Sequence, residues 1–136
     1  MTPDYFNEND LKHLPGTLGI KVTSVQKGRL EAELDIAEKH LALNGYLHAG
    51  TIITLADSGA GYGCMANLPD GASGFTTIEL KSNHLATATE GTIRCVSECL
   101  HTGRTTQVWE SSVYSAATGK LLAKFTCTQL ILYPRN

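Results

Sequence analysis

The order of apolar and polar positions predicts strands at both ends of the chain and one helix in its middle. Residues 29–36 show this most clearly, because every second residue is apolar and those between are charged, as in a strand with one buried face. Residues 19–25 precede them across a turn at Gln26-Lys27-Gly28, so the two segments predict a hairpin. Residues 4–13 predict a short amphipathic helix that ends near Pro15-Gly16.

Residues 49–67 predict a long apolar helix, because they lack strand alternation and proline and are followed by Pro69 and Gly71. The stretch 47–63, LHAGTIITLADSGAGYG, contains a single ionisable carboxylate, Asp57. Glycines at positions 59, 61 and 63 would each cost about 0.5–1 kcal/mol in a helix relative to alanine. They are expected where the helix backbone lies close to a sheet or to a second copy of itself.

Four segments after this helix are rich in Val, Ile, Thr and aromatic residues, and turn residues separate them. These predicted strands are 74–84, 91–100, 105–114 and 121–133. A helix with so little polar surface has to be covered on nearly all sides. The sequence therefore predicts an α+β fold, with a curved antiparallel sheet wrapped around one long central helix. With 136 residues, the chain predicts a single domain spanning 1–136.

Charge and composition limit the kinds of partner, location and metal site that the sequence predicts. The net charge is −2, and the absence of a basic cluster removes the electrostatic reason to expect a nucleic acid or an anionic membrane. The N-terminus is acidic where a signal peptide would be basic and then apolar, so a cytoplasmic location is expected. The four cysteines form no CxxC pair and the histidines lack metal-ligand spacing, so no metal site is predicted.

Asp57 has three interpretations on pattern alone. It is an N-cap that starts a new helical turn, a buried partner of an arginine or lysine, or a general base or nucleophile on a rigid apolar helix. His48-Ala49-Gly50 stands where the helix is expected to begin, and the free N–H groups of a helix N-terminus are suited to hold an oxyanion. Asp57 lies about 13 Å of helical rise beyond His48, so one chain cannot bring the pair onto one atom.

The segment GYLHAGTIITLADSGAGYG resembles the signature of hotdog-fold acyl-CoA thioesterases: Gly, two residues, His-Gly-Gly, then Asp or Glu nine positions after the His. The stretch ELKSNHLATATEGTIRCVSECLHTGRTTQVW is similar to the same superfamily along its strands. The resemblance covers residues 17–132. It implies a hotdog fold and hydrolysis of an acyl-CoA thioester to the free acid and CoA, with coenzyme A as part of the substrate and no further cofactor. Aryl, short-chain and medium-chain acyl groups all remain open.

Within this superfamily, the 4-hydroxybenzoyl-CoA and 1,4-dihydroxy-2-naphthoyl-CoA thioesterases carry Glu at the acid position and Ser or Thr one helical turn later. The phenylacetate-degradation type carries Asp, with Ser or Thr on the facing strand. This chain has Asp57, Gly61 one turn later and Thr77 at the strand position, and so it resembles the second type. Strict alternation by itself would put Thr77 on one face with Glu79 and Lys81, a solvent or interface face.

The resemblance implies catalytic roles for Asp57, for the Ala49 backbone N–H as oxyanion donor, for Thr77 and for His48. His48 is either a proton carrier or a residue that positions its loop. Ala49 stands where the family has Gly, and Ala42 stands where it has an Asn or Gln, for which Asn44 is a candidate substitute.

The remaining residues that the resemblance implies lie around the substrate. Gly50 and Ser58 are expected to bind substrate. The turn with His101, Gly103 and Arg104 is either a candidate site for the CoA phosphates or an ordinary hairpin turn with a solvated arginine.

The same resemblance implies a homodimer in which Asp57 of one chain faces the Ala49 end of the other, and it allows a dimer of dimers. Two rival functions remain open: a hotdog dehydratase acting on hydroxyacyl thioesters, and a non-catalytic module that binds or senses acyl-CoA.

Overall fold

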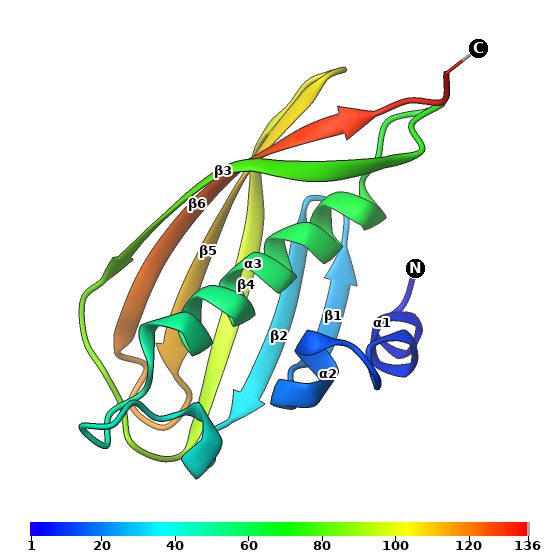
Figure 1. Ribbon diagram of the computed structural model, residues 1–136. Helices are drawn as coiled ribbons and strands as arrows, with labels where there is room; N and C mark the ends of the chain where they lie inside the picture. The colour runs from blue at the N-terminus through cyan, green and yellow to red at the C-terminus, as the bar shows by residue number, and fades with distance from the viewer. Residues whose placement is uncertain (136) are drawn as a thin grey trace.

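A six-stranded antiparallel sheet curves around one long helix in the computed structural model, which describes residues 1–135 (Figure 1). The strands are β1 (Lys21–Gln26), β2 (Arg29–Asp35), β3 (Gly74–His84), β4 (Thr92–Thr102), β5 (Thr106–Ser115) and β6 (Leu121–Leu132). The helices are α1 (Pro3–Asn9), α2 (Leu14–Leu18), the 3₁₀ turn η1 (Glu38–His40) and α3 (Ala49–Ala66). The strands lie in the order β1-β2-β4-β5-β6-β3. The predicted α+β hotdog architecture is confirmed.

One local prediction is correct only in part, because the helix expected over 4–13 is shorter and a second helix follows it. α1 ends at Asn9, and Pro15 lies in the first turn of α2 instead of stopping a helix. Proline suits this position because its missing N–H would have no partner in the first turn of a helix. The side chain of Asn7 then ties α1 to the sheet, accepting from the N–H of Val22 and donating to its carbonyl.

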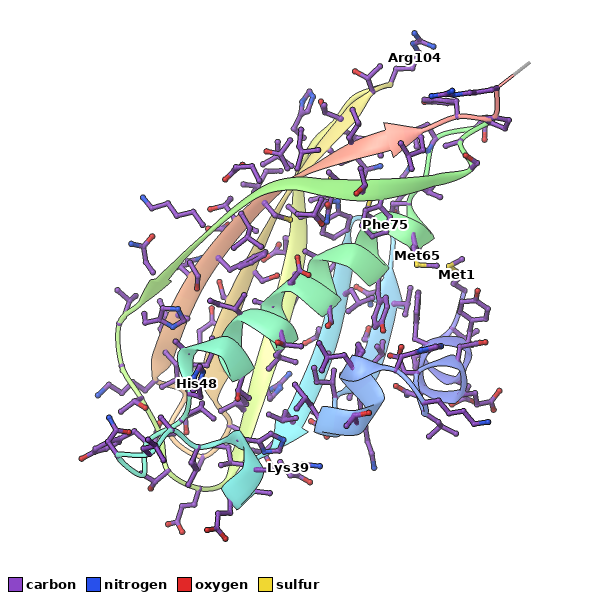
Figure 2. All side chains as sticks on the ribbon, in the orientation of Figure 1. Met1, Lys39, His48, Met65, Phe75 and Arg104 are labelled. Atoms are coloured by element: carbon purple, nitrogen blue, oxygen red, sulfur yellow. The ribbon has the colours of Figure 1, made fainter. Side chains whose placement is uncertain are left out.

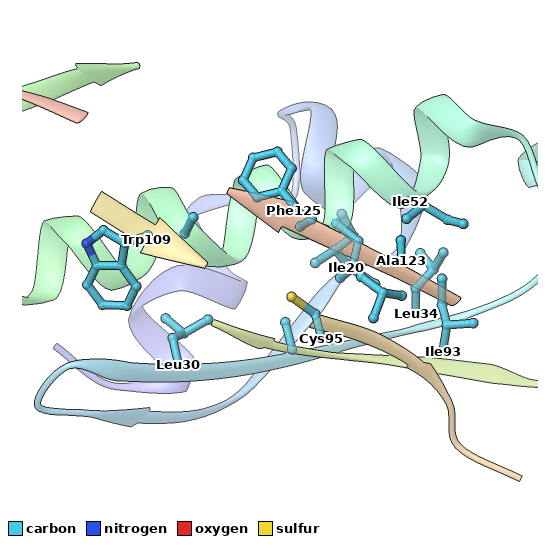
Figure 3. Packing of buried hydrophobic residues seen from close by; sticks show 14 of the residues in the cluster. Ile20, Leu30, Leu34, Ile52, Ile93, Cys95, Trp109, Ala123 and Phe125 are labelled. Carbon is cyan, nitrogen blue, oxygen red and sulfur yellow. The ribbon is translucent and has the colours of Figure 1, made fainter. Parts of the chain in front are cut away.

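The core lies between α3 and the concave face of the sheet (Figure 3). Trp109 and Phe125 are fully buried there, and they come from adjacent strands. The helix approaches the sheet so closely that a Cβ at Gly63 would lie 2.5 Å from the Trp109 ring, and one at Gly59 would lie 2.5 Å from Ser97 Oγ. The expectation that these glycines allow close approach to the sheet is confirmed.

The opposite flank of α3 is covered by the N-terminal segment. The ring of Phe6 stacks on that of Tyr62, with centroids 4.5 Å apart, and the Tyr62 hydroxyl donates to Asp10 Oδ1. Burial, together with the neighbouring Asp10 carboxyl, raises the pKa of Tyr62 well above its ordinary value. α1 and α2 therefore close one side of the long helix, and β3 borders the other.

Candidate active site

The start of α3 is built by His48, which is the N-cap of the helix. Its Nδ1 accepts a hydrogen bond of 2.7 Å from the N–H of Gly50, so in the neutral ring the proton is on Nε2. A Cβ at position 50 would lie 2.9 Å from the same nitrogen, which explains the glycine. These contacts tie the His48 ring to the first turn of α3, as expected of a residue that positions its loop, and neither of the two roles that the sequence left open is tested by them.

Ala49 is the first residue of α3 and is exposed. The N–H groups that follow it are occupied: Gly50 donates to the His48 side chain, and Thr51 donates to the His48 carbonyl at 3.0 Å. The Ala49 N–H has no such partner among residues 1–135. It is an open donor at the positive end of the helix dipole, which is the arrangement that stabilises an oxyanion.

Asp57 lies in the middle of an unbroken helix, so it is no N-cap. None of the ion pairs among residues 1–135 includes it, and its Oδ1 is buried without a hydrogen-bond partner. Burial raises the pKa of this carboxyl above its usual range. The described residues therefore contradict the N-cap and show no arginine or lysine partner within one chain, and a half-buried carboxylate with an unused oxygen and a raised pKa is chemically suited to take a proton from water.

Thr77 lies on the same side of the sheet as α3, and the interpretation from strict alternation is wrong. A β-bulge between Thr77 and Glu79 shifts the register, so that Thr77 faces Gln129 whereas Glu79 faces Thr128. The extra residue is Ile78. It turns Glu79 to the outer face, where the Thr128 hydroxyl donates to Glu79 Oε2 at 2.9 Å.

The register of β3 against α3 indicates that Thr77 and Asp57 have similar positions along the helix axis. β3 runs antiparallel to α3 (Figure 1), and the Phe75 ring lies 3.1 Å from the Cβ position of Gly61. Thr77 comes two strand residues after Phe75, and Asp57 comes one helical turn before Gly61. Both steps cover about 6 Å in the same direction. Burial, then the nearby Asp57 charge, raise the pKa of Cys127 to about 12.

Gln129 is the residue that the sequence analysis missed. It is fully buried on β6, and its Oε1 accepts a hydrogen bond of 2.6 Å from the Thr77 hydroxyl. Its Nε2 has no hydrogen-bond partner among the described residues. The signal was present in the strand 121–133, where a glutamine occupies the buried phase of an otherwise apolar alternation.

The other predicted substrate residues are divided between two ends of the molecule. Asn44 lies in the loop before α3, where its Oδ1 accepts from the N–H of Tyr46 at 3.1 Å within its own turn. Ser58 is half-buried in the middle of α3, one residue after Asp57.

His101, Gly103 and Arg104 lie at the tip of the β4–β5 hairpin. Figure 2 shows Arg104 beyond the C-terminal end of α3, far from His48 at its N-terminal end. The Arg104 guanidinium lies 5.9 Å from the ring centroid of Tyr133, and the N–H of Gly103 donates to Thr106 at 2.8 Å. Within one chain, therefore, the hairpin tip is not brought to Ala49.

Neither a metal cluster nor a membrane helix is found in residues 1–135. No three His, Cys, Asp or Glu side chains of this part of the chain gather closely enough to hold a metal ion. No helix within it is both long enough and apolar enough to cross a bilayer.

Comparison with known proteins gives a consistent result. A family model described as the Thioesterase superfamily matches residues 44–121. The chain is 36% identical over 115 residues to a 1,4-dihydroxy-2-naphthoyl-CoA hydrolase of Listeria monocytogenes, covering 85% of this chain and 92% of that protein. It is 30% identical over 123 residues to the Escherichia coli protein of the same name, covering 88% and 87%. A thioesterase structure from Haemophilus influenzae superposes with a TM-score of 0.91 at 20% identity, covering 98% of this chain and 92% of that one, and supports the fold alone.

Proposed function

The chain belongs to the thioesterase superfamily of hotdog-fold proteins and is an acyl-CoA thioesterase, and we propose that Asp57 and the Ala49 N–H carry its chemistry. The observation that supports this most directly is the buried, unpartnered Oδ1 of Asp57 on an apolar helix. Keeping such a group without an ion pair costs stability, and a general base is the use that fits its raised pKa.

The proposed site is formed by two chains. Ala49 and Asp57 are eight residues apart on one straight helix, which is about 12 Å. One chain therefore cannot present both groups to the same thioester carbon. In a homodimer, the open side of α3 would bring Asp57 of one protomer to the Ala49 end of its partner, and the hairpin tip with Arg104 would reach the CoA phosphates of a substrate held between them.

Hydrolysis then proceeds by attack of water. A water oxygen forms a bond to the thioester carbon, its proton goes to the Asp57 carboxylate, and the carbonyl pair moves onto oxygen. The Ala49 N–H and the helix dipole stabilise that oxyanion. When the carbonyl re-forms, the C–S bond breaks and its electron pair leaves with sulfur as the CoA thiolate, a good leaving group that needs little protonation. The acid product loses its proton at neutral pH and Asp57 returns its own to solvent.

An aromatic acyl group is the proposed substrate class. The two named relatives are hydrolases of a naphthoyl-CoA, and here the Phe75 ring lies against Gly61, one helical turn from Asp57. Within the superfamily, we assign the chain to the phenylacetate-degradation type, because it has Asp57 on the helix and Thr77 on the facing strand. A cytoplasmic location and a dimer of dimers stay predictions.

Two variants test the mechanism by release of free thiol from phenylacetyl-, benzoyl-, 1,4-dihydroxy-2-naphthoyl- and hexanoyl-CoA. Asp57→Asn keeps the shape and removes the base, so kcat is expected to fall on the order of 10²-fold or more. Asp70→Asn is the matched control, because Asp70 is an exposed carboxylate beyond the end of α3. Equal rates for wild type and Asp57→Asn would refute the role of Asp57.

Ala49→Pro removes only the proposed oxyanion donor. Proline is favoured at the first position of a helix, and His48, with φ −68° and ψ 135°, already has the conformation that precedes a proline. The expected loss in kcat is about 10²–10³-fold with the fold intact, whereas Ala49→Ser, which keeps the N–H, should stay near wild type.

Co-expressing the two inactive variants tests the shared site. A mixed dimer of Asp57→Asn and Ala49→Pro chains has one complete site, so random pairing should restore about a quarter of the wild-type activity. Activity no higher than that of the separate variants would show that each chain supplies both groups itself.

A further inference from the structure

Gln129 and Gln107 are directly paired across β5 and β6, and both are fully buried, yet their amides are used differently. The Nε2 of Gln107 donates to the Asn67 carbonyl at 2.9 Å, and its Oε1 accepts from Trp109 Nε1 at 2.8 Å. Gln129 makes only the bond to Thr77, and its Nε2 has no partner within residues 1–135. Buried amides are normally satisfied, so the one that is not requires an explanation.

The Thr77–Gln129 bond determines what the hydroxyl offers to a third group. A threonine hydroxyl has one proton and two lone pairs. The proton is on the line to Gln129 Oε1, at a short 2.6 Å, so towards any other neighbour Thr77 Oγ1 acts only as an acceptor. Thr77 pairs with the inward-facing Gln129 and so lies on the α3 side of the sheet, whereas the β-bulge at Ile78 turns Glu79 to the outer face. From the register of Phe75 against Gly61, Thr77 is expected at about the level of Asp57 along α3.

We propose that Gln129 is a positioning residue for the hydrolytic water. It engages the hydroxyl proton of Thr77 in a hydrogen bond, so that Thr77 Oγ1 and the Asp57 carboxylate each accept a hydrogen bond from one O–H of that water. The inference rests on the proposed role of Asp57. A water that donates to both acceptors has its lone pair directed away from them, towards the thioester carbon. On attack, the C–O bond forms and one water proton passes to Asp57. The other water proton, which is hydrogen-bonded to Thr77 Oγ1, stays on the former water oxygen.

The test compares Gln129→Met with Gln107→Met, since methionine matches glutamine in length and removes the amide. For hydrolysis of an aryl-CoA by the intact protein, Gln129→Met is expected to lower kcat about 10-fold, with KM changed less than about 2-fold and Tm unchanged. Gln107→Met is expected to lower Tm while the folded protein keeps the wild-type kcat. A purely structural role for Gln129 would give the same result for both variants.

Thr77 variants make the test specific and provide a second route if Gln129→Met does not fold. Thr77→Val should lose as much kcat as Gln129→Met, and Thr77→Ser, which keeps the hydroxyl, should recover most of it. Because Gln129 acts through Thr77, the double variant Gln129→Met/Thr77→Val should be no slower than Thr77→Val alone.

Two outcomes would overturn the proposal: wild-type kcat in Gln129→Met, or losses in the double variant that multiply. Either one, found while Asp57→Asn remains inactive, contradicts only the positioning role. An active Asp57→Asn would instead remove the mechanism on which that role depends.

Discussion

The two sides of α3 treat buried polar groups in opposite ways. On the sheet side, the Ser97 and Ser111 hydroxyls are hydrogen-bonded to each other at 2.7 Å, and Ser111 also donates to the Ala56 carbonyl at 2.9 Å. On the β3 side, Asp57 Oδ1, Ser82 Oγ and Gln129 Nε2 are buried without partners among residues 1–135. The first side is complete as one chain. The second contains the donors and acceptors that a substrate, a water or another chain would use.

In the proposed mechanism, this difference separates residues that hold the fold from residues that serve the reaction. A buried polar network whose members are all paired rigidifies the core, whereas an unpaired group lowers stability and persists where function needs it. Gln107 and Gln129 allow the most direct comparison, because they are the same residue type, face each other on adjacent strands and are both fully buried.

The largest loss of stability is therefore expected when a group is removed from the side whose buried polar groups are all hydrogen-bonded. Gln107→Met leaves the Trp109 N–H and the Asn67 carbonyl without their partner, and each unmet group costs about 1–3 kcal/mol. The free energy of unfolding in urea should fall by about 2–4 kcal/mol, whereas Gln129→Met should change it by less than about 1 kcal/mol. Equal losses would mean that the two sides do not differ as described.

Two helix glycines make the same comparison without polar groups. In Gly63→Ala the new methyl would lie 2.5 Å from the buried Trp109 ring, and overpacking of this kind costs about 1–3 kcal/mol. In Gly61→Ala it would lie 3.1 Å from the tip of the half-buried Phe75 ring, which has room to shift, so the gain in helix propensity should nearly cancel the cost. Thermal melts of the two variants measure this, and a Gly61→Ala protein as unstable as Gly63→Ala would contradict it.

The smallest effect is expected from the charge of Asp57 on stability. Its pKa is raised in the folded protein above the ordinary 3.8, so the folded state binds the proton more tightly than the unfolded state. Stability from this group is then highest below pH 3.8 and falls as pH rises to the raised value. At neutral pH Asp57→Asn should therefore have a higher Tm than wild type while being inactive, and a lower Tm would contradict this.

The same shift has the opposite sign for catalysis, because the base must be ionised. kcat/KM should fall as pH drops through the raised pKa of Asp57, so the acid limb lies above the usual aspartate range. The nearby thiols Cys64 and Cys127 have pKa values of about 12 and do not titrate on that limb. An acid limb at the ordinary aspartate pKa would contradict the view that burial raises the pKa of the catalytic carboxylate.

Much of the fold was readable in the sequence, because its elements depend on local patterns. The predicted strand 29–36 and the predicted helix 49–67 each exceed the observed β2 and α3 by one residue at the C-terminal end. The site was readable only in part. Asp57 stood out as a lone carboxylate in an apolar segment, and the His48 N-cap stood at the helix start. Pro15 misled because a proline both ends a helix and begins one.

The sequence by itself determined which residues lie on each face of a helix or strand wherever its period is unbroken, since helix and strand periods follow from the covalent chain. Only the tertiary structure decided which buried groups find partners. The bulge at Ile78 reverses the facing of β3 between Thr77 and Glu79, and no alternation rule contains it. Gln107 is satisfied by Trp109 and by the distant Asn67, whereas Gln129 meets only Thr77. Such pairings depend on strands and a helix far apart in the chain, and distances between them arise only when the sheet closes around α3.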